Sequence, residues 1–189
     1  MSNATGKQDV MHGLKHVQLT GIAPIMFDRY AGNNVQLSPM DKAHYNGEAL
    51  VLPALNFISF LSSEGTECAP KRVCGKMWKT TAHACLSYVT VLPDYIQFSR
   101  NGVPLTKDNH NMTVAYHCAR VKKAGLSIPN PKERPLLALP WELNFDLKLA
   151  DNNEIDLSTL HKIIVEGGLS IGLGTFRHFF GKFNVTKWE

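Results

Sequence analysis

Residues 141–188 carry the clearest fold signal and read WELNFDLKLADNNEIDLSTLHKIIVEGGLSIGLGTFRHFFGKFNVTKW. Residues 141–149 alternate strictly between apolar and polar side chains, which predicts a strand with one buried face. Residues 156–166 place apolar side chains at helical spacing, and Gly167-Gly168 follows as a helix C-cap would. Residues 183–188 alternate again. The stretch therefore predicts a strand, a helix, a glycine-rich loop and a final strand.

The preceding sequence predicts further short strands and one helix. Residues 16–25 alternate and indicate a first strand, which Pro24 should end. Residues 49–52 indicate an extended piece before Pro53, which is placed to open a helix. The apolar face of that helix is predicted to be Leu55, Ile58 and Leu61. Other strands are expected within residues 88–92, 96–98 and 114–121, with a turn at Asn101-Gly102.

Two polar stretches interrupt these elements. Residues 28–47 are rich in Asn, Gly and Pro and read as a long loop. Residues 122–140 contain four prolines and are predicted to form a loop or an extended arm. We expect a single α+β domain over residues 1–189, in which a ferredoxin-like (RRM-related) antiparallel sheet is covered by helices on one face.

Composition favours some classes of protein and excludes others. The formal net charge of +4 suits a polyanionic partner without requiring one. We expect no membrane partner, because no stretch approaches the roughly 20 apolar residues of a membrane span. The first residues lack the apolar core of a signal peptide, so we expect a cytoplasmic protein. The four cysteines, Cys68, Cys74, Cys85 and Cys118, lack the paired spacing of zinc ligands, and we expect no metal and no cofactor.

Common nucleotide and hydrolase motifs do not occur. Gly172-Leu173-Gly174 lacks the third glycine of a dinucleotide fingerprint and follows a predicted helix instead of a strand. None of the three Gly-Lys pairs is followed by Ser or Thr, and no Gly-x-Ser-x-Gly elbow is present.

Residues 167–183 combine five glycines with two cations, a histidine and four phenylalanines. Backbone amides at Gly172 and Gly174, with Arg177 and Lys182, could bind phosphates. One of Phe176, His178 or Phe179 could stack on a base. In the alternative interpretation these phenylalanines are mostly core, and the glycines only allow a tight turn from helix to strand.

The same residues carry a resemblance. The helix that ends in Gly167-Gly168, followed by 171–177 and 180–183, resembles the glycine-rich C-terminal motif of the RAMP superfamily, the RNA-binding proteins of CRISPR systems. Residues 49–55 resemble the extended piece and helix start that follow the first strand in many of them. A group of uncharacterised phage and prophage proteins ends in a similar pattern. The resemblance implies an RRM-related fold, a nucleic-acid ligand and often the assembly of several copies.

Three function hypotheses follow. The first is a non-catalytic protein that coats or scaffolds single-stranded RNA or DNA, as a possible homo-oligomer or part of a ribonucleoprotein. Its predicted binding residues are Gly172, Gly174, Phe176, Arg177, His178, Lys182, Arg120, Lys122 and Lys123. The second is a metal-independent endoribonuclease of RAMP type, with His16, His44, His117 and His178 as candidate bases. The third is a phage-encoded interaction or assembly factor that uses residues 28–47 and 122–140.

Overall fold

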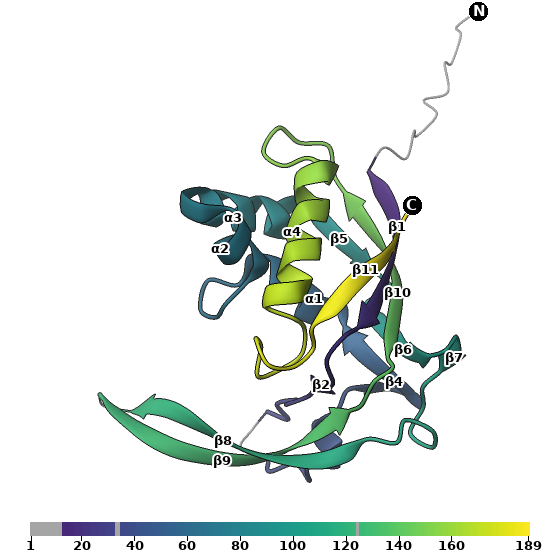
Figure 1. Cartoon of the computed structure of the whole chain (residues 1–189), viewed down its shortest axis with the longest axis vertical. Coiled ribbons are helices and arrows are strands. Elements are labelled where there is room, and N and C mark those ends of the chain that lie inside the picture. Colours follow the sequence, from purple (N-terminus) through teal and green to yellow (C-terminus); the bar gives the residue numbers. More distant parts are fainter. Residues whose placement is uncertain (1–12, 33–34, 124) are drawn as a thin grey trace, which may run out of the picture.

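The structure is a computed structural model that describes residues 13–32, 35–123 and 125–189, without the side chains of residues 119–123. Within these residues the chain is an α+β protein with an antiparallel sheet of eight strands, a second sheet of three strands and four α-helices (Figure 1). No helix in this described part is long and apolar enough to cross a membrane.

The large sheet is built around its longest pairing. Its strands are β1 (Leu14–Gly21), β3 (Tyr45–Asn46), β4 (Ala49–Pro53), β5 (Val89–Leu92), β6 (Tyr95–Arg100), β7 (Val103–Pro104), β10 (Glu142–Leu149) and β11 (Phe183–Trp188). The main order is β11–β1–β10–β6–β4–β3, with β5 on β10 and β7 on β6. Strand β10 pairs with β1 along one edge and with both β5 and β6 along the other. The predicted strands at 141–149 and 183–188 are confirmed.

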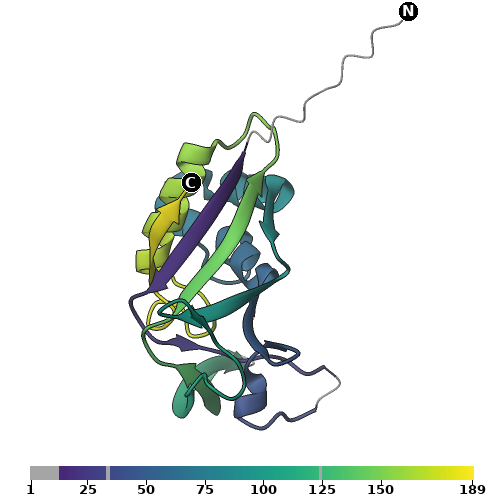
Figure 2. The same ribbon diagram turned by 90° about the vertical axis from the view of Figure 1, so that its right-hand side faces the viewer.

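All four helices lie on one face of this sheet, as Figures 1 and 2 show together. They are α1 (Ala54–Ser62), α2 (Ala69–Val73), α3 (Trp78–Tyr88) and α4 (Leu157–Ser170), with short 3-10 turns η1 (Met40–Lys42) and η2 (Gly75–Met77). The core between the layers is aromatic: Phe57 packs 4.9 Å from Phe145, and Phe60 packs 5.6 Å from Phe183. The opposite face of the sheet is polar, and on it His16 of β1 bonds Asp146 of β10 at 2.8 Å.

Two local predictions for the helices are wrong in part, and two helices were not predicted. In the predicted apolar face of α1, Leu61 is buried and Ile58 packs against the core, but Leu55 is 78% exposed, and Phe57 and Phe60 are buried in addition. Helix α4 does not end at Gly167-Gly168 but continues to Ser170. A Cβ at Gly167 would lie 2.4 Å from the Cβ of Ala69, so this glycine lets α4 approach α2 closely. Helices α2 and α3 were not predicted.

The second sheet has the order β2–β9–β8 and consists of β2 (Ile25–Met26), β8 (Thr113–Lys123) and β9 (Leu126–Leu137). Strands β8 and β9 form a long hairpin that projects away from the body of the protein (Figure 1). The predicted extended arm at 122–140 is therefore mostly one strand of a hairpin, paired with the strand predicted at 114–121.

The prolines of β9 are compatible with this pairing because of their spacing. Pro129, Pro131 and Pro135 all occupy odd positions, so their backbone groups point to the same edge of the strand. That edge faces away from β8, since the amide of Phe27, beyond β2, donates to the Pro135 carbonyl at 3.1 Å. None of these prolines therefore lies where a backbone N–H would have to donate to β8, and the hydrogen bonds between β8 and β9 are not interrupted.

Candidate functional site

The glycine-rich loop (residues 171–182) connects α4 to β11 and is folded tightly against its surroundings. The amide of Leu173 donates to the Gly181 carbonyl at 2.9 Å, and the amide of Gly181 donates to the Pro24 carbonyl at 2.7 Å. Two large residues of this loop have positive φ: Phe176 at 57° and His178 at 79°. Side chains of this size rarely adopt that conformation, and such strain is concentrated at functional sites.

The amides of Gly172 and Gly174 are already used inside the protein. Gly172 donates to the Gly167 carbonyl at 3.2 Å, and Gly174 donates to Oδ1 of Asn56 at 3.0 Å. A Cβ at Gly174 would lie 2.5 Å from the Met26 carbonyl oxygen. These glycines therefore permit close packing, and their amides do not form the anion site that we expected from the sequence.

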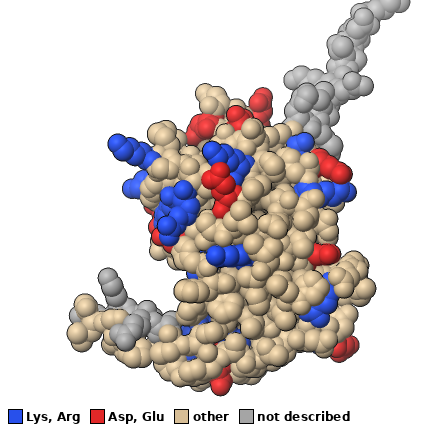
Figure 3. Space-filling model, viewed as in Figure 1, with Lys and Arg blue, Asp and Glu red and all other residues tan. Residues whose placement is uncertain are grey.

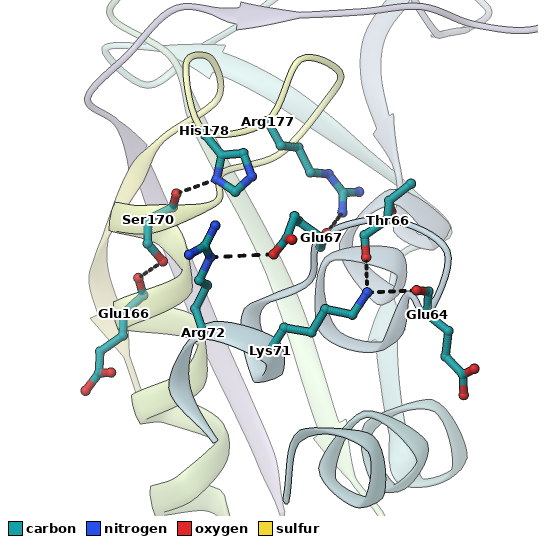
Figure 4. A network of polar contacts seen from close by, with 9 residues as sticks. All are labelled: Glu64, Thr66, Glu67, Lys71, Arg72, Glu166, Ser170, Arg177 and His178. Atoms are coloured by element: carbon teal, nitrogen blue, oxygen red, sulfur yellow. Dashed lines mark hydrogen bonds and ion pairs between the residues drawn. The ribbon is translucent and has the colours of Figure 1, made fainter. Parts of the chain in front are cut away.

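Arg177 lines the loop cavity, an opening of about 390 Å³ that also involves Ser59, Thr66 and His178. Its Nη1 donates to the Glu67 carbonyl at 2.9 Å and its Nη2 to the Ser59 hydroxyl at 3.3 Å. Burial lowers the pKa of Arg177 from its usual value. The Nδ1 atom of His178 lies 3.2 Å from the Ser170 carbonyl oxygen, which holds the ring beside Arg177 (Figure 4).

A basic surface adjoins the loop cavity. Arg72 of α2 pairs with Glu67 at 3.5 Å, below the loop cavity (Figure 4). Lys71 donates to the carbonyls of Glu64 and Thr66 at 2.7 and 2.6 Å. Lys and Arg side chains gather over the α2 and α3 side of the helical face (Figure 3).

An aromatic cluster joins the glycine-rich loop to the hairpin. The ring of His117, on β8, lies 5.6 Å from Phe176 and 5.1 Å from Phe180. The guanidinium of Arg134, on β9, lies 5.1 Å from the centre of the Phe176 ring. Arg134 in turn bonds Asp28 at 2.8 Å. The loop, the hairpin and the start of the 28–42 segment thus meet at one point.

The hairpin cavity, of about 560 Å³, lies between the 28–42 segment and the base of the hairpin. Two exposed tyrosines line it, Tyr30 at 78% and Tyr116 at 66% exposed. Lys42 spans it by donating to the Glu133 carbonyl at 2.7 Å, and Lys132 reaches Asp28 at 3.2 Å. The two insertions predicted from sequence therefore form the walls of one opening.

A small cavity of about 220 Å³ shares lining residues with each of the two larger ones. It shares Asp28 with the hairpin cavity, and Gly174 and Thr175 with the loop cavity. His44 and Asn56 also line it. Burial, and then the charge of Arg29, lower the pKa of His44. A neutral imidazole near pH 7 therefore lies in the cavity between the other two, and we call this row of three cavities the path.

The structure brings together some of the predicted site residues and not others. Phe176, Arg177 and His178 share the loop cavity. The carbonyl of Lys182 accepts a hydrogen bond from the amide of Ile22 at 2.8 Å, beside the start of β11. Arg120, Lys122 and Lys123 lie on β8 near the hairpin tip, and their side chains are outside the described residues.

Sequence reasoning missed Asp28, Tyr30, Tyr116 and Arg134 as site residues. Asp28, Tyr30 and Arg134 fall within the two stretches, 28–47 and 122–140, that the third hypothesis assigned to partner binding, and the cations Lys132 and Arg134 were a further signal. Their approach to the glycine-rich loop depends on contacts across more than a hundred residues, such as Arg134 with Asp28.

The cysteines are not part of this path. Cys68 and Cys85 are buried free thiols, and burial raises the pKa of Cys85 to about 12. Such thiols are poor nucleophiles at neutral pH.

Comparison of the chain with models of protein families and with curated proteins gave no match.

Proposed function

We propose that this protein binds single-stranded nucleic acid along the three adjoining cavities and acts by coating or scaffolding, not by catalysis. The observation that carries this proposal is that the three cavities adjoin one another in a row. The hairpin cavity, the small cavity and the loop cavity share lining residues from one to the next. A row of adjoining openings suits an extended polymer better than a compact small molecule.

The charges along the path support a polyanion. Arg29 donates to the Asp41 carbonyl at 3.1 Å, and Lys42 donates to the Glu133 carbonyl at 2.7 Å. The bonds of Arg177 likewise go to a carbonyl and a hydroxyl. None of these acceptors is a carboxylate, so these hydrogen bonds do not offset the charge of the three cations, which can attract a phosphate.

Exposed aromatic rings support single-stranded nucleic acid. Tyr30 and Tyr116 line the hairpin cavity and are largely exposed. Flat rings beside cations are the usual means by which proteins hold unpaired bases, because every base can stack whatever its sequence. A paired duplex would hide its base faces from both tyrosines.

The proposal includes a ferredoxin-like core and a RAMP-like ancestry. Support for the topology comes from the order β11–β1–β10–β5, which is 4-1-3-2 if these are counted as the four strands of the core. Helix α4 precedes β11, and α1 and α3 precede β5, as two crossover elements would. The fold alone does not specify a ligand.

A titration with labelled oligonucleotides tests the proposal. We expect single-stranded RNA or DNA to bind with an affinity that falls steeply with salt, because phosphate contacts release counterions. Tyr116→Ala should weaken binding by about 5- to 150-fold, the range of one lost stacking contact. Arg177→Ala should weaken it and flatten the salt dependence. Fluorescence anisotropy at two salt concentrations measures both effects.

The matched control is Tyr95→Ala, since Tyr95 is half exposed but lines a separate groove beside α1 and β5. It should bind as the unchanged protein does. A flat salt dependence, or equal losses in Tyr95→Ala and Tyr116→Ala, would contradict the proposal. Purified protein that carries a protein partner but no nucleic acid would instead favour an interaction or assembly factor.

RNA cleavage is the second candidate function, and the position of His44 favours it. Of the four histidines considered from sequence, His16 bonds Asp146 on the polar sheet face and His117 is packed among phenylalanines. His178 lines the loop cavity, where its Nδ1 is held against the Ser170 carbonyl. His44 lines the small cavity at the centre of the path. The lowered pKa leaves its imidazole neutral and able to accept a proton.

If this cavity cleaves RNA, His44→Ala should reduce the cleavage rate by about 10²- to 10⁴-fold, the usual contribution of a general base. Cleavage in the presence of a chelator is followed on a labelled single-stranded RNA by gel electrophoresis. His16→Ala is the control and should retain full activity. The absence of cleavage would exclude this function, and cleavage that survives in His44→Ala would exclude His44 as its general base.

A further inference from the structure

Arg134 is a buried cation with unused hydrogen-bond donors. The residue is only 4% exposed, and its Nη2 donates to Oδ2 of Asp28 at 2.8 Å. Among the residues that the structure describes, its Nε and Nη1 atoms have no hydrogen-bond partner. Unsatisfied donors on a buried charge are costly, so such a group in a native fold calls for a ligand or another compensating contact.

A second orphan atom lies in the same cluster. The Nε2 atom of His117 is buried and, within the described part of the chain, also has no hydrogen-bond partner. His117 and Arg134 both contact the ring of Phe176, at 5.6 and 5.1 Å. The unused donors of β8 and β9 thus converge on one aromatic side chain.

Phe176 lies against both of these groups and also borders open space. Its ring contacts Arg134, and the residue also lines the loop cavity. Its backbone has a φ of 57°, a conformation that is unfavourable for a side chain of this size. A movement that relaxed this backbone and turned the ring aside would open the cavity toward Arg134.

We propose that Arg134 is a phosphate-binding residue covered by Phe176. This inference rests on the proposed function, since the phosphate would belong to the bound nucleic acid. The ring of Phe176 turns away as the strand enters the loop cavity, and Nε and Nη1 of Arg134 donate to phosphate oxygens. His117, in the tautomer with a proton on Nε2, donates to the same group. The released ring is then available to stack on a neighbouring base.

Phosphate is the ligand that matches this donor set. Guanidinium groups bind phosphate through charge-assisted hydrogen bonds, which are stronger than bonds between neutral groups. Asp28 holds the guanidinium through one nitrogen and leaves the other two free. The ion pair therefore fixes the position of Arg134 without using up its donors.

The first experiment measures the effect of inorganic phosphate on the unfolding temperature, against chloride at equal ionic strength. Phe176→Ala removes the cover, so phosphate should raise its unfolding temperature by several degrees more than that of the unchanged protein. Phe176→Ala combined with Arg134→Lys should lose this gain. Phe179→Ala is the matched control, because Phe179 is in the same loop but is 76% exposed. The same measurement on Phe176→Leu, which keeps an apolar side chain in the cluster but removes the aromatic ring, repeats the test in a variant that is less disruptive to packing. We expect phosphate to stabilise it more than the unchanged protein.

The second experiment measures oligonucleotide affinity in Arg134→Lys, which keeps the charge but changes the donor geometry. We expect a loss of at least about tenfold, as for one charge-assisted hydrogen bond. Full affinity in Arg134→Lys with no phosphate effect in Phe176→Ala would overturn this inference and leave the proposed function standing. Phosphate stabilisation of Phe176→Ala in a protein that binds no oligonucleotide would support the covered site and contradict the proposed function.

Discussion

Replacing Trp141 with Ala is expected to lower the free energy of unfolding by about 3–5 kcal/mol. Trp141 precedes β10 and is fully buried, with its ring 5.9 Å from Phe98. Its Nε1 donates to the Ala23 carbonyl at 2.9 Å. The variant therefore leaves a large cavity and an unpaired acceptor. Urea denaturation followed by circular dichroism measures the loss.

The destabilisation should extend to the glycine-rich loop, because Trp141 bonds residue Ala23 of the segment 23–26, which accepts hydrogen bonds from that loop. Ala23 is followed by Pro24, whose carbonyl accepts the Gly181 amide, and Met26 accepts the Thr175 amide. Trp188→Ala is the control, since Trp188 is partly buried and stacks on His161 at 4.6 Å. We expect a clearly smaller loss there. Equal losses of unfolding free energy in the two variants would contradict the expectation that Trp141 contributes more to stability than Trp188.

The periodicity of apolar residues correctly predicted those strands that have one face on the helices and the other exposed to solvent. Strand β10 alternates because one face packs on helices and the other is polar, and the same holds for β1. In helix α1 the prediction failed at Leu55, since Phe57 and Phe60 add apolar side chains beside Leu61 and these decide which side of the helix is buried. Helix α3 buries only Ala82, Ala84 and Cys85, so its small side chains gave little signal.

The candidate site was predictable only in its local part. Residues 176–178 could be singled out because their composition is unusual within a short segment. The fate of the Gly174 amide was not predictable, since its acceptor Asn56 is 118 residues away. The same applies to the hairpin cavity, whose walls come from residues about a hundred positions apart. Pairing across such distances is set by the sheet register, which composition does not reveal.

Asp28→Asn is expected to lower the free energy of unfolding by about 3 kcal/mol at neutral pH. The Asp28 carboxylate accepts hydrogen bonds from Arg134 at 2.8 Å and from Lys132 at 3.2 Å. Without the carboxylate charge, the Arg134 cation remains buried with no opposite charge beside it. Lys132→Ala is the control, because Lys132 is more exposed and its pairing should contribute less than about 1 kcal/mol. Urea denaturation at pH 7 measures both.

The pH dependence of the stability lost in Asp28→Asn shows whether the charge of Asp28 causes the loss. Burial by itself would raise the pKa of Asp28, but the hydrogen bonds and charges of Arg134 and Lys132 outweigh it, so the pKa is lowered. In the unfolded chain Asp28 titrates near its ordinary value of about 3.9. The stabilisation is therefore complete above about pH 5 and is lost as the pH falls below about 4 and through the folded pKa. The difference between the unchanged protein and Asp28→Asn should shrink over that acidic range. A difference that stays constant down to pH 3 would show that shape, and not charge, holds Arg134 in place beneath Phe176.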